Sequence, residues 1–165
     1  MRYITLFLLT IIQQIFADNT VVLLSKAKHF LDQNKTTEAI KIYKKLDLNN
    51  IVEAKYNLGM IYGFGINGIK KEKQKAKYYL TEAASAHHKK APYYLAMLLS
   101  GEKDANKTKI MLHVMESAVS GFDKSQLEYG KILYDLNKTE DAMVWIQKAC
   151  NQGNQEAQKF LKNNL

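Results

Sequence analysis

A short pattern of alanine, aromatic, leucine and glycine residues recurs along this chain, and it constrains the fold more than any other feature. It is complete in Ala54–Tyr62, a related helical pattern occupies Ala76–Ala84, and degenerate copies follow twice. Repeats of roughly 30–40 residues are typical of solenoids, in which each pair of helices buries its apolar face only against its neighbours. The sequence therefore predicts an all-α, right-handed superhelical α-solenoid of about four helix-turn-helix repeats with a C-terminal capping helix.

Apolar spacing places the helices of each repeat. The expected hairpins pair Val21–Gln33 with Thr36–Leu46, Val52–Tyr62 with Lys73–Ala86, Ala91–Leu99 with Asn106–Ser120, and Ser125–Leu136 with Thr139–Asn151. A last helix, Gln155–Lys162, would cover the apolar side of the final hairpin. The glycine-rich stretch Gly63–Ile69 would supply left-handed backbone for the turn of the second hairpin.

Small residues stand at matching positions in the first helices, with Gly59 and Gly130 as the clearest pair. A glycine inside a helix costs up to about 1 kcal/mol relative to alanine, so it needs a reason such as a close helix–helix approach. We expect Tyr79 and Trp145 to fill the larger gap beside these glycines.

These residues resemble the Sel-one-like repeats (SLR), relatives of the tetratricopeptide repeats. The first half of the family pattern is matched by Ala54, Tyr56, Leu58, Gly59 and Tyr62, and the second half by Ala142, Trp145, Lys148, Ala149 and Gly153. The resemblance implies a scaffold for protein–protein contacts and assembly, often in secreted or envelope-associated bacterial proteins. Some members with interlocking cysteine pairs are described as acting on β-lactams, and this chain lacks those cysteines.

The first residues are typical of a secretory signal. Arg2 supplies a positive charge, an apolar run extends from Tyr3 to Ile12, and Ala17 offers a cleavage site before Asp18. We expect residues 1–17 to be a cleaved signal peptide and residues 18–165 to form the repeat domain, in a secreted or periplasmic protein. The alternative is an uncleaved N-terminal helix that tethers the protein to a membrane.

The net charge of +8 comes almost wholly from lysine, because Arg2 is the only arginine. Lysine lacks the planar fork that reads phosphates and base edges, so a specific nucleic-acid reader is not expected. The excess charge indicates either solvated helix faces or peripheral contact with an anionic envelope surface.

We find no pattern for catalysis, a metal or a cofactor, and we expect none of the three. Adjacent helical residues such as His87 and His88 point about 100° apart, so they fit helix capping better than a shared metal ion. His113 falls on an aromatic packing position. Cys150, the only cysteine, fits a small buried hydrophobe better than a reactive thiol.

The tripeptide Asn-Lys-Thr occurs at Asn34, Asn106 and Asn137, each time before the second helix of a repeat. Each is a formal glycosylation sequon. Asn and Thr at a helix start are also capping residues, so the sequence leaves both interpretations open.

We expect the first helices to face a concave groove that holds another protein or peptide. The positions not used for packing would then contact this partner, or would simply be exposed. They are Lys55, Asn57, Met60, Tyr94, Met97, Gln126, Glu128 and Lys131. The sequence thus favours a non-catalytic scaffold for protein interaction or complex assembly. The alternative function is a regulator of cell-wall enzymes, or a hydrolase of cell-wall or β-lactam-like substrates.

Overall fold

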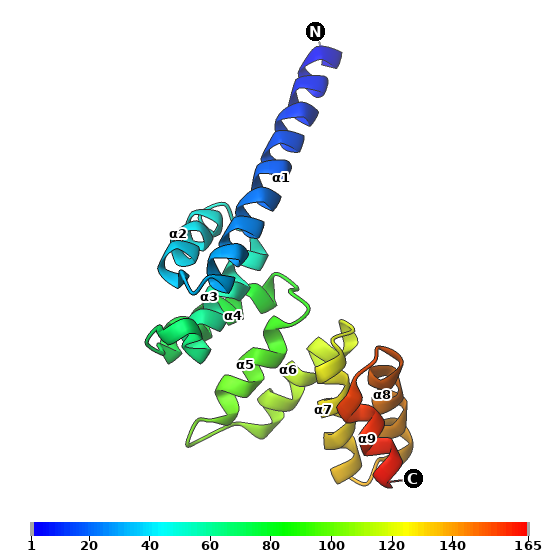
Figure 1. Cartoon of the computed structure of the whole chain (residues 1–165). Coiled ribbons are helices and arrows are strands. Elements are labelled where there is room, and N and C mark those ends of the chain that lie inside the picture. Colours follow the sequence, from blue (N-terminus) through cyan, green and yellow to red (C-terminus); the bar gives the residue numbers. More distant parts are fainter. Residues whose placement is uncertain (1, 165) are drawn as a thin grey trace. The chain divides into compact units, whose positions relative to one another are not determined.

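The computed structural model describes the backbone of residues 2–164 and the side chains of residues 6–164. The described residues form nine α-helices and one short 3-10 helix, η1, without a strand (Figure 1). In chain order they are α1 (Arg2–Asp32), α2 (Thr36–Asp47), α3 (Val52–Phe64), η1 (Ile66–Gly68), α4 (Lys73–Ser85), α5 (Ala91–Ser100), α6 (Lys107–Val119), α7 (Asp123–Asp135), α8 (Thr139–Asn151) and α9 (Gln155–Asn164). The predicted all-α solenoid of helical hairpins with a capping helix is confirmed.

The chain divides into two compact units, residues 1–79 and residues 80–165, with the boundary inside α4. In the first unit, α1 pairs with α2, and α2 packs on α3. Ala27, Ala39 and Ala54 are completely buried there, so the helices approach closely around Tyr43 and Leu58. The rings of Tyr62 and Tyr79 stack with centroids 6.1 Å apart, which joins α3 to the middle of α4.

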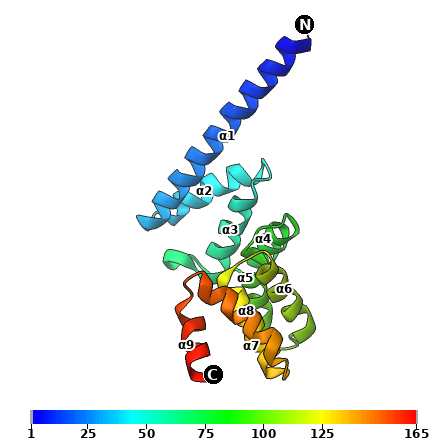
Figure 2. The ribbon, with the colours of Figure 1, turned by 90° about the vertical axis from the view of Figure 1, so that its right-hand side faces the viewer.

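Helix α1 is longer than the first-repeat helix expected from Val21. Only its C-terminal part packs on α2, and its N-terminal part projects away from α2 and α3 (Figures 1 and 2). Apolar side chains such as Phe7, Ile12 and Phe16 are exposed on it. Leu6–Asp32 is long and apolar enough to cross a membrane, a test that a signal sequence also passes.

In the second unit, α5 pairs with α6, α6 packs on α7, α7 pairs with α8, and α8 carries α9. The terminal core joins Leu127, Ile146 and Ala149 to Ala157 of α9, with Phe160 packed against it. Helix α9 therefore covers the apolar side of the last hairpin, as the sequence predicted.

The packing predicted beside Gly130 is corrected by the structure. Gly130 of α7 is buried, but the side chain that occupies the space beside it is Ile146, not Trp145. Trp145 packs edge to face on Tyr129, with ring centroids 5.4 Å apart, and Lys148 lies over its ring at 4.0 Å. The close approach of the helices was predicted correctly, and the side chain that fills it was not.

Most turns between the helices share one backbone motif. A residue with positive φ follows the helix, its N–H donates to the carbonyl three residues back, and the next N–H donates to the carbonyl five residues back. This is the Schellman arrangement, which satisfies carbonyls at a helix C-terminus. The positive-φ positions are Asn34, Asn50, His87, Gly121, Asn137 and Gly153.

The motif corrects the capping assigned to the sequons and the histidine pair. Asn34 and Asn137 terminate the preceding helices, and only Asn106 is an N-cap, accepting the Lys109 N–H at 2.9 Å. His87 adopts the left-handed backbone, whereas Nδ1 of His88 accepts from the N–H of Ala91 at 3.2 Å at the start of α5. The histidines therefore act through backbone shape and N-terminal capping, not through a charge at a helix C-terminus.

The glycine-rich turn of the first unit adopts left-handed backbone, as expected. Gly65 ends α3 at φ 68°, and Asn67 and Gly68 also have positive φ. The Asn67 side-chain amide donates to the Leu31 carbonyl at 2.9 Å and to Thr36 Oγ1 at 3.0 Å. These bonds fasten the long turn to the α1–α2 connection.

Candidate protein-binding groove

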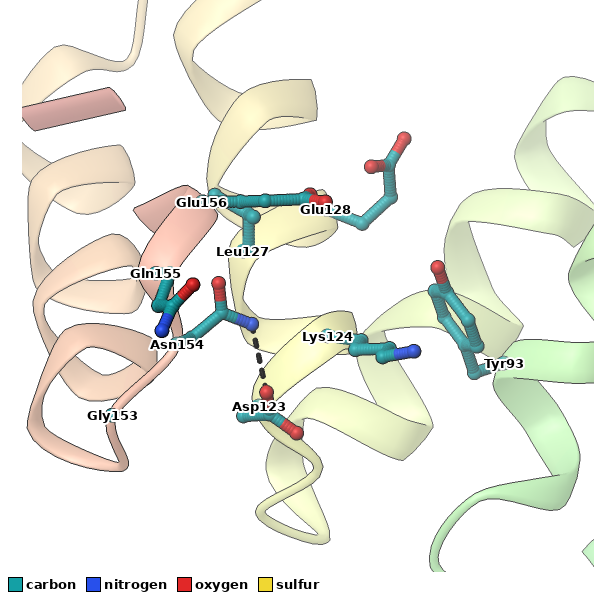
Figure 3. A pocket seen from close by; sticks show the side chains of 9 residues that line it. All are labelled: Tyr93, Asp123, Lys124, Leu127, Glu128, Gly153, Asn154, Gln155 and Glu156. Carbon is teal, nitrogen blue, oxygen red and sulfur yellow. Dashed lines mark hydrogen bonds between the residues drawn. The ribbon is translucent and has the colours of Figure 1, made fainter. Parts of the chain in front are cut away.

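A cavity of about 430 Å³ lies on the second unit where α5, α7 and the start of α9 meet (Figure 3). Helices α5 and α7 are the first helices of their repeats. The capping helix α9 corresponds to the first helix of a further repeat. The cavity is lined by Tyr93, Asp123, Lys124, Leu127, Glu128, Gly153, Asn154, Gln155 and Glu156. We call this surface the α5–α7–α9 groove.

Its end at α9 is fixed by a side-chain link between two helix starts. The Asn154 amide donates to Asp123 Oδ2 at 2.7 Å, the bond drawn in Figure 3, and Asn154 Oδ1 accepts the Ala157 N–H at 3.0 Å. One asparagine therefore caps α9 and ties it to the first turn of α7. Gly153, at φ 84°, gives the backbone turn that brings this asparagine into place.

Tyr93 forms the α5 side of the groove. Its ring packs edge to face on Tyr94 and on Phe122, with centroids 5.2 and 5.4 Å away. Burial raises the pKa of Tyr93, and the nearby carboxylate of Glu128 raises it further. The ring is thus held rigidly by aromatic neighbours, and Figure 3 shows its hydroxyl facing the space beside α7.

The ionisable side chains of the groove are mostly acidic. Asp123, Glu128 and Glu156 line it together with one base, Lys124, whose side chain points towards Tyr93 in Figure 3. Glu128 has a distant ion pair, with its carboxylate 3.9 Å from Lys131 Nζ. The groove therefore combines negative charge with the aromatic ring of Tyr93.

A second hollow of about 240 Å³ adjoins the first, since Tyr93 and Glu128 line both. Its other residues come from α5 and α6, and they include Met97, which is 45% exposed. The groove thus continues along α5 with an apolar extension. The larger cavity is lined mostly by polar side chains, and the extension along α5 is mainly apolar. A concave surface that combines apolar area with a few placed polar groups is typical of ligand sites in proteins.

The predicted groove positions fall into two groups. Lys55 and Gln126 are buried, so the expectation that they face a partner does not hold for them. Lys55 Nζ lies 2.7 Å from Asp47 Oδ1, and Gln126 accepts from the Gln152 amide at 2.7 Å and donates to the Ala118 carbonyl at 3.3 Å. Both side chains join neighbouring segments of the solenoid.

The remaining positions keep exposed area. Asn57 and Met60 lie on α3 in the first unit, and Tyr94, Met97, Glu128 and Lys131 lie in the second. Met97 and Glu128 come together in the extended groove. The sequence reasoning missed Tyr93, Lys124, Leu127 and Glu156. Helical spacing could have identified two of them, because residues four apart lie on one face of a helix. Tyr93 is four residues before Met97, and Lys124 is four residues before Glu128.

The other polar candidates serve packing. Ser125 donates to Ser117 Oγ at 2.8 Å, and Ser117 donates to the Lys89 carbonyl at 2.7 Å, so this buried pair is satisfied within the fold. Burial raises the pKa of the half-buried Cys150 thiol, which packs against the terminal core. Within the described side chains, no three His, Cys, Asp or Glu residues converge as a metal site requires.

Comparison with known sequences places the repeats. Residues 52–88 and 126–154 match the Sel1 repeat. Among curated proteins, no sequence matches this chain at a significant level.

Solved structures show the same fold. A protective antigen of uropathogenic Escherichia coli with an SLR fold is 24% identical, with a TM-score of 0.73 over 87% of this chain and 33% of its own. A Sel1 repeat protein from Oxalobacter formigenes is 20% identical, with a TM-score of 0.73 over 88% of this chain and 63% of its own. MamA is 21% identical, with a TM-score of 0.56 over 90% of this chain and 86% of its own. This chain therefore spans a third of the antigen and under two thirds of the Oxalobacter protein.

Proposed function

The chain is a Sel1 repeat protein, and on that premise we propose that it binds a segment of another protein in the α5–α7–α9 groove. A Sel1 repeat scaffold fits a role in protein interaction. The observation that carries the proposal is the cavity of about 430 Å³ formed by first helices, with Tyr93 on one side and α9 on the other. The groove extends along α5 to the exposed Met97.

The side chains of the groove suit binding of a peptide. Tyrosine offers a large contact area with little loss of conformational entropy, and methionine adapts its shape to a partner. The Asn154–Asp123 bond and the packing of Tyr93 on Phe122 hold the walls in place before a partner arrives. Less ordering on binding leaves more of the contact energy as affinity.

Site-specific photocrosslinking tests this function. A photoreactive phenylalanine analogue placed at Met97 should capture a discrete partner from the native compartment, identified by mass spectrometry. The matched control is the same analogue at Val144 of α8, a second helix, because Val144 is 54% exposed and Met97 is 45% exposed. Capture at Met97 but not at Val144 supports the groove. Equal capture at both positions, or none at Met97, contradicts it.

Asn57 and Met60 of α3 retain exposed area in the first unit, and we propose that they contact a partner there. The photoreactive analogue placed at Met60 should then capture a partner. No capture at Met60 would restrict binding to the second unit.

We also propose that the protein is exported, with residues 1–17 as the signal. The supporting observation is the apolar part of α1, on which Leu6, Phe7, Ile12 and Phe16 are all exposed. A helix that is apolar on all sides requires a lipid or protein environment around it. The mature protein should begin at Asp18 when its N-terminus is sequenced. A mature chain that still contains residues 2–17 would favour the membrane-tethered alternative.

A further inference from the structure

The charges of the α5–α7–α9 groove define the partner more closely. We infer that the groove selects a segment with a lysine or arginine side chain. This inference rests on the proposed peptide-binding function. The chain as a whole carries 24 basic and 16 acidic side chains, yet three of the four charged residues lining the cavity are carboxylates. The groove is therefore opposite in charge to the protein around it. A cationic segment is attracted to it, and an acidic one is attracted to the lysine-rich surface elsewhere.

The three carboxylates do not contribute equally. Asp123 accepts the Asn154 hydrogen bond and begins α7, where a negative charge stabilises the helix dipole. Its role in the fold is sufficient reason for its presence. Glu128 lies in the middle of α7, and neither helix-start stabilisation nor a buried hydrogen bond accounts for it. Glu156 lies in the first turn of α9, with its side chain on the groove.

The neighbouring lysines leave these carboxylates available. Lys131 lies 3.9 Å from Glu128, and both side chains are more than a third exposed, so this pair is weak. Lys131 and Lys159 lie outside the groove, in a neighbouring hollow of about 280 Å³ that Glu156 also lines. Lys124 is the one base inside the groove. It would repel a lysine placed beside it and would favour seating the cation towards Glu128 and Glu156.

The apolar surface fits the rest of a basic side chain. A lysine or arginine buries its methylene stem along apolar groups and keeps its charged head near polar ones. The Tyr93 ring would receive the stem, and the carboxylates beside it would receive the head. The same unit already contains such contacts, because Lys90 lies 5.9 Å from the Phe122 ring and Lys148 lies 4.0 Å from the Trp145 ring.

The binding of two fluorescently labelled peptides to the full chain, solubilised in detergent, tests this inference. They have the same length and the same tyrosine, leucine and serine content, and they differ only in carrying two lysines or two glutamates. In fluorescence anisotropy at low salt, the lysine peptide should bind about tenfold more tightly than the glutamate peptide. The Glu128→Gln/Glu156→Gln variant should lose most of this preference. Raising the salt should reduce the preference in the parent chain, because exposed charges are screened.

The control variant is Glu116→Gln, which removes an exposed carboxylate from α6 outside the cavity. It should keep the preference for the lysine peptide, and both variants should keep the circular dichroism of the parent chain. Equal binding of the two peptides, binding of neither, or the same loss in the control variant would overturn the inference. In each of these outcomes, selective crosslinking from Met97 would still support the groove itself, so the two proposals fail separately.

Discussion

Gly130 on α7 lies directly against Ile146 on α8. A Cβ atom at Gly130 would be 2.5 Å from Ile146 Cγ1 and 3.1 Å from the Ala142 carbonyl oxygen, whereas real side chains do not approach below 3.0 Å. The contact with backbone leaves little freedom to relax. The glycine is thus required by the distance between two helices, and the helix pair tolerates its lower helix propensity for that reason.

We predict that Gly130→Ala destabilises the second unit by about 1–3 kcal/mol, since overpacking outweighs the gain in helix propensity. Urea unfolding followed by the fluorescence of Trp145, the only tryptophan, measures this unit. Gly101→Ala is the control, because its nearest neighbour would be the Leu98 carbonyl at 3.8 Å. A loss of stability in Gly101→Ala equal to that in Gly130→Ala would contradict the packing argument.

The Lys55–Asp47 ion pair gives a second prediction. The side chains are 10% and 20% exposed, so removing one partner leaves a charge with poor access to water. We expect Lys55→Met to lower the free energy of unfolding by about 1–3 kcal/mol, and the Lys55→Met/Asp47→Leu double variant to lower it less than the sum of the single changes.

The control pair for this cycle is in the same unit. Lys75 and Glu72 lie 2.6 Å apart but are exposed, so Lys75→Met should leave thermal unfolding followed by circular dichroism unchanged. Additive effects in the Lys55 and Asp47 cycle would show that the two side chains do not act together.

The spacing of apolar residues was sufficient to predict the helices, but it was insufficient to predict which polar side chains are buried. The helix starts at Thr36, Val52 and Ala91 were predicted without error. Lys55 was expected on the surface because no pattern within α3 reveals that Asp47, from the preceding helix, lies beside it. Partners from different elements depend on how those elements pack, and helical periodicity reports only which face a residue occupies.

The sequons show another limit. In a very short turn, the residue that ends one helix immediately precedes the residue that caps the next, so Asn-Lys-Thr fits both positions. The backbone separates them, with Asn137 at φ 58° and Asn106 at φ −77°. Likewise, the groove includes Glu156 because Asn154 turns α9 towards α7, a contact outside any single repeat pattern.

This difference predicts that serine is tolerated at Asn106 and destabilising at Asn137. Serine is a good N-cap, so Asn106→Ser should change stability by less than about 0.5 kcal/mol. At Asn137 the same change places an unfavourable residue in left-handed backbone, and we expect a loss of about 1 kcal/mol. Asn137→Gly should preserve stability, because glycine adopts positive φ freely. Urea unfolding of the three variants checks this, and a loss in Asn106→Ser as large as that in Asn137→Ser would contradict it.

The last prediction concerns stability at alkaline pH. Burial raises the pKa of Tyr43 to about 12, and the carboxylates of Glu53 and Asp32 add to the effect. The unfolded chain loses this proton near pH 10, while the folded chain retains it up to about pH 12, so the unfolded state binds fewer protons between these values. Stability contributed by the neutral ring is therefore fully present below pH 10 and is lost as the pH rises towards 12.

We expect the parent chain to lose roughly 1–3 kcal/mol more than Tyr43→Phe between pH 9 and pH 12. Phenylalanine retains the buried ring and removes the titrating hydroxyl, so the comparison isolates this group from the lysines and the other tyrosines. Tyr78→Phe is the control, because Tyr78 is 58% exposed, and its profile should follow the parent chain. Thermal unfolding by circular dichroism across this range measures all three proteins. Parallel profiles for the parent and Tyr43→Phe would show that Tyr43 ionises equally easily in the folded and unfolded chain.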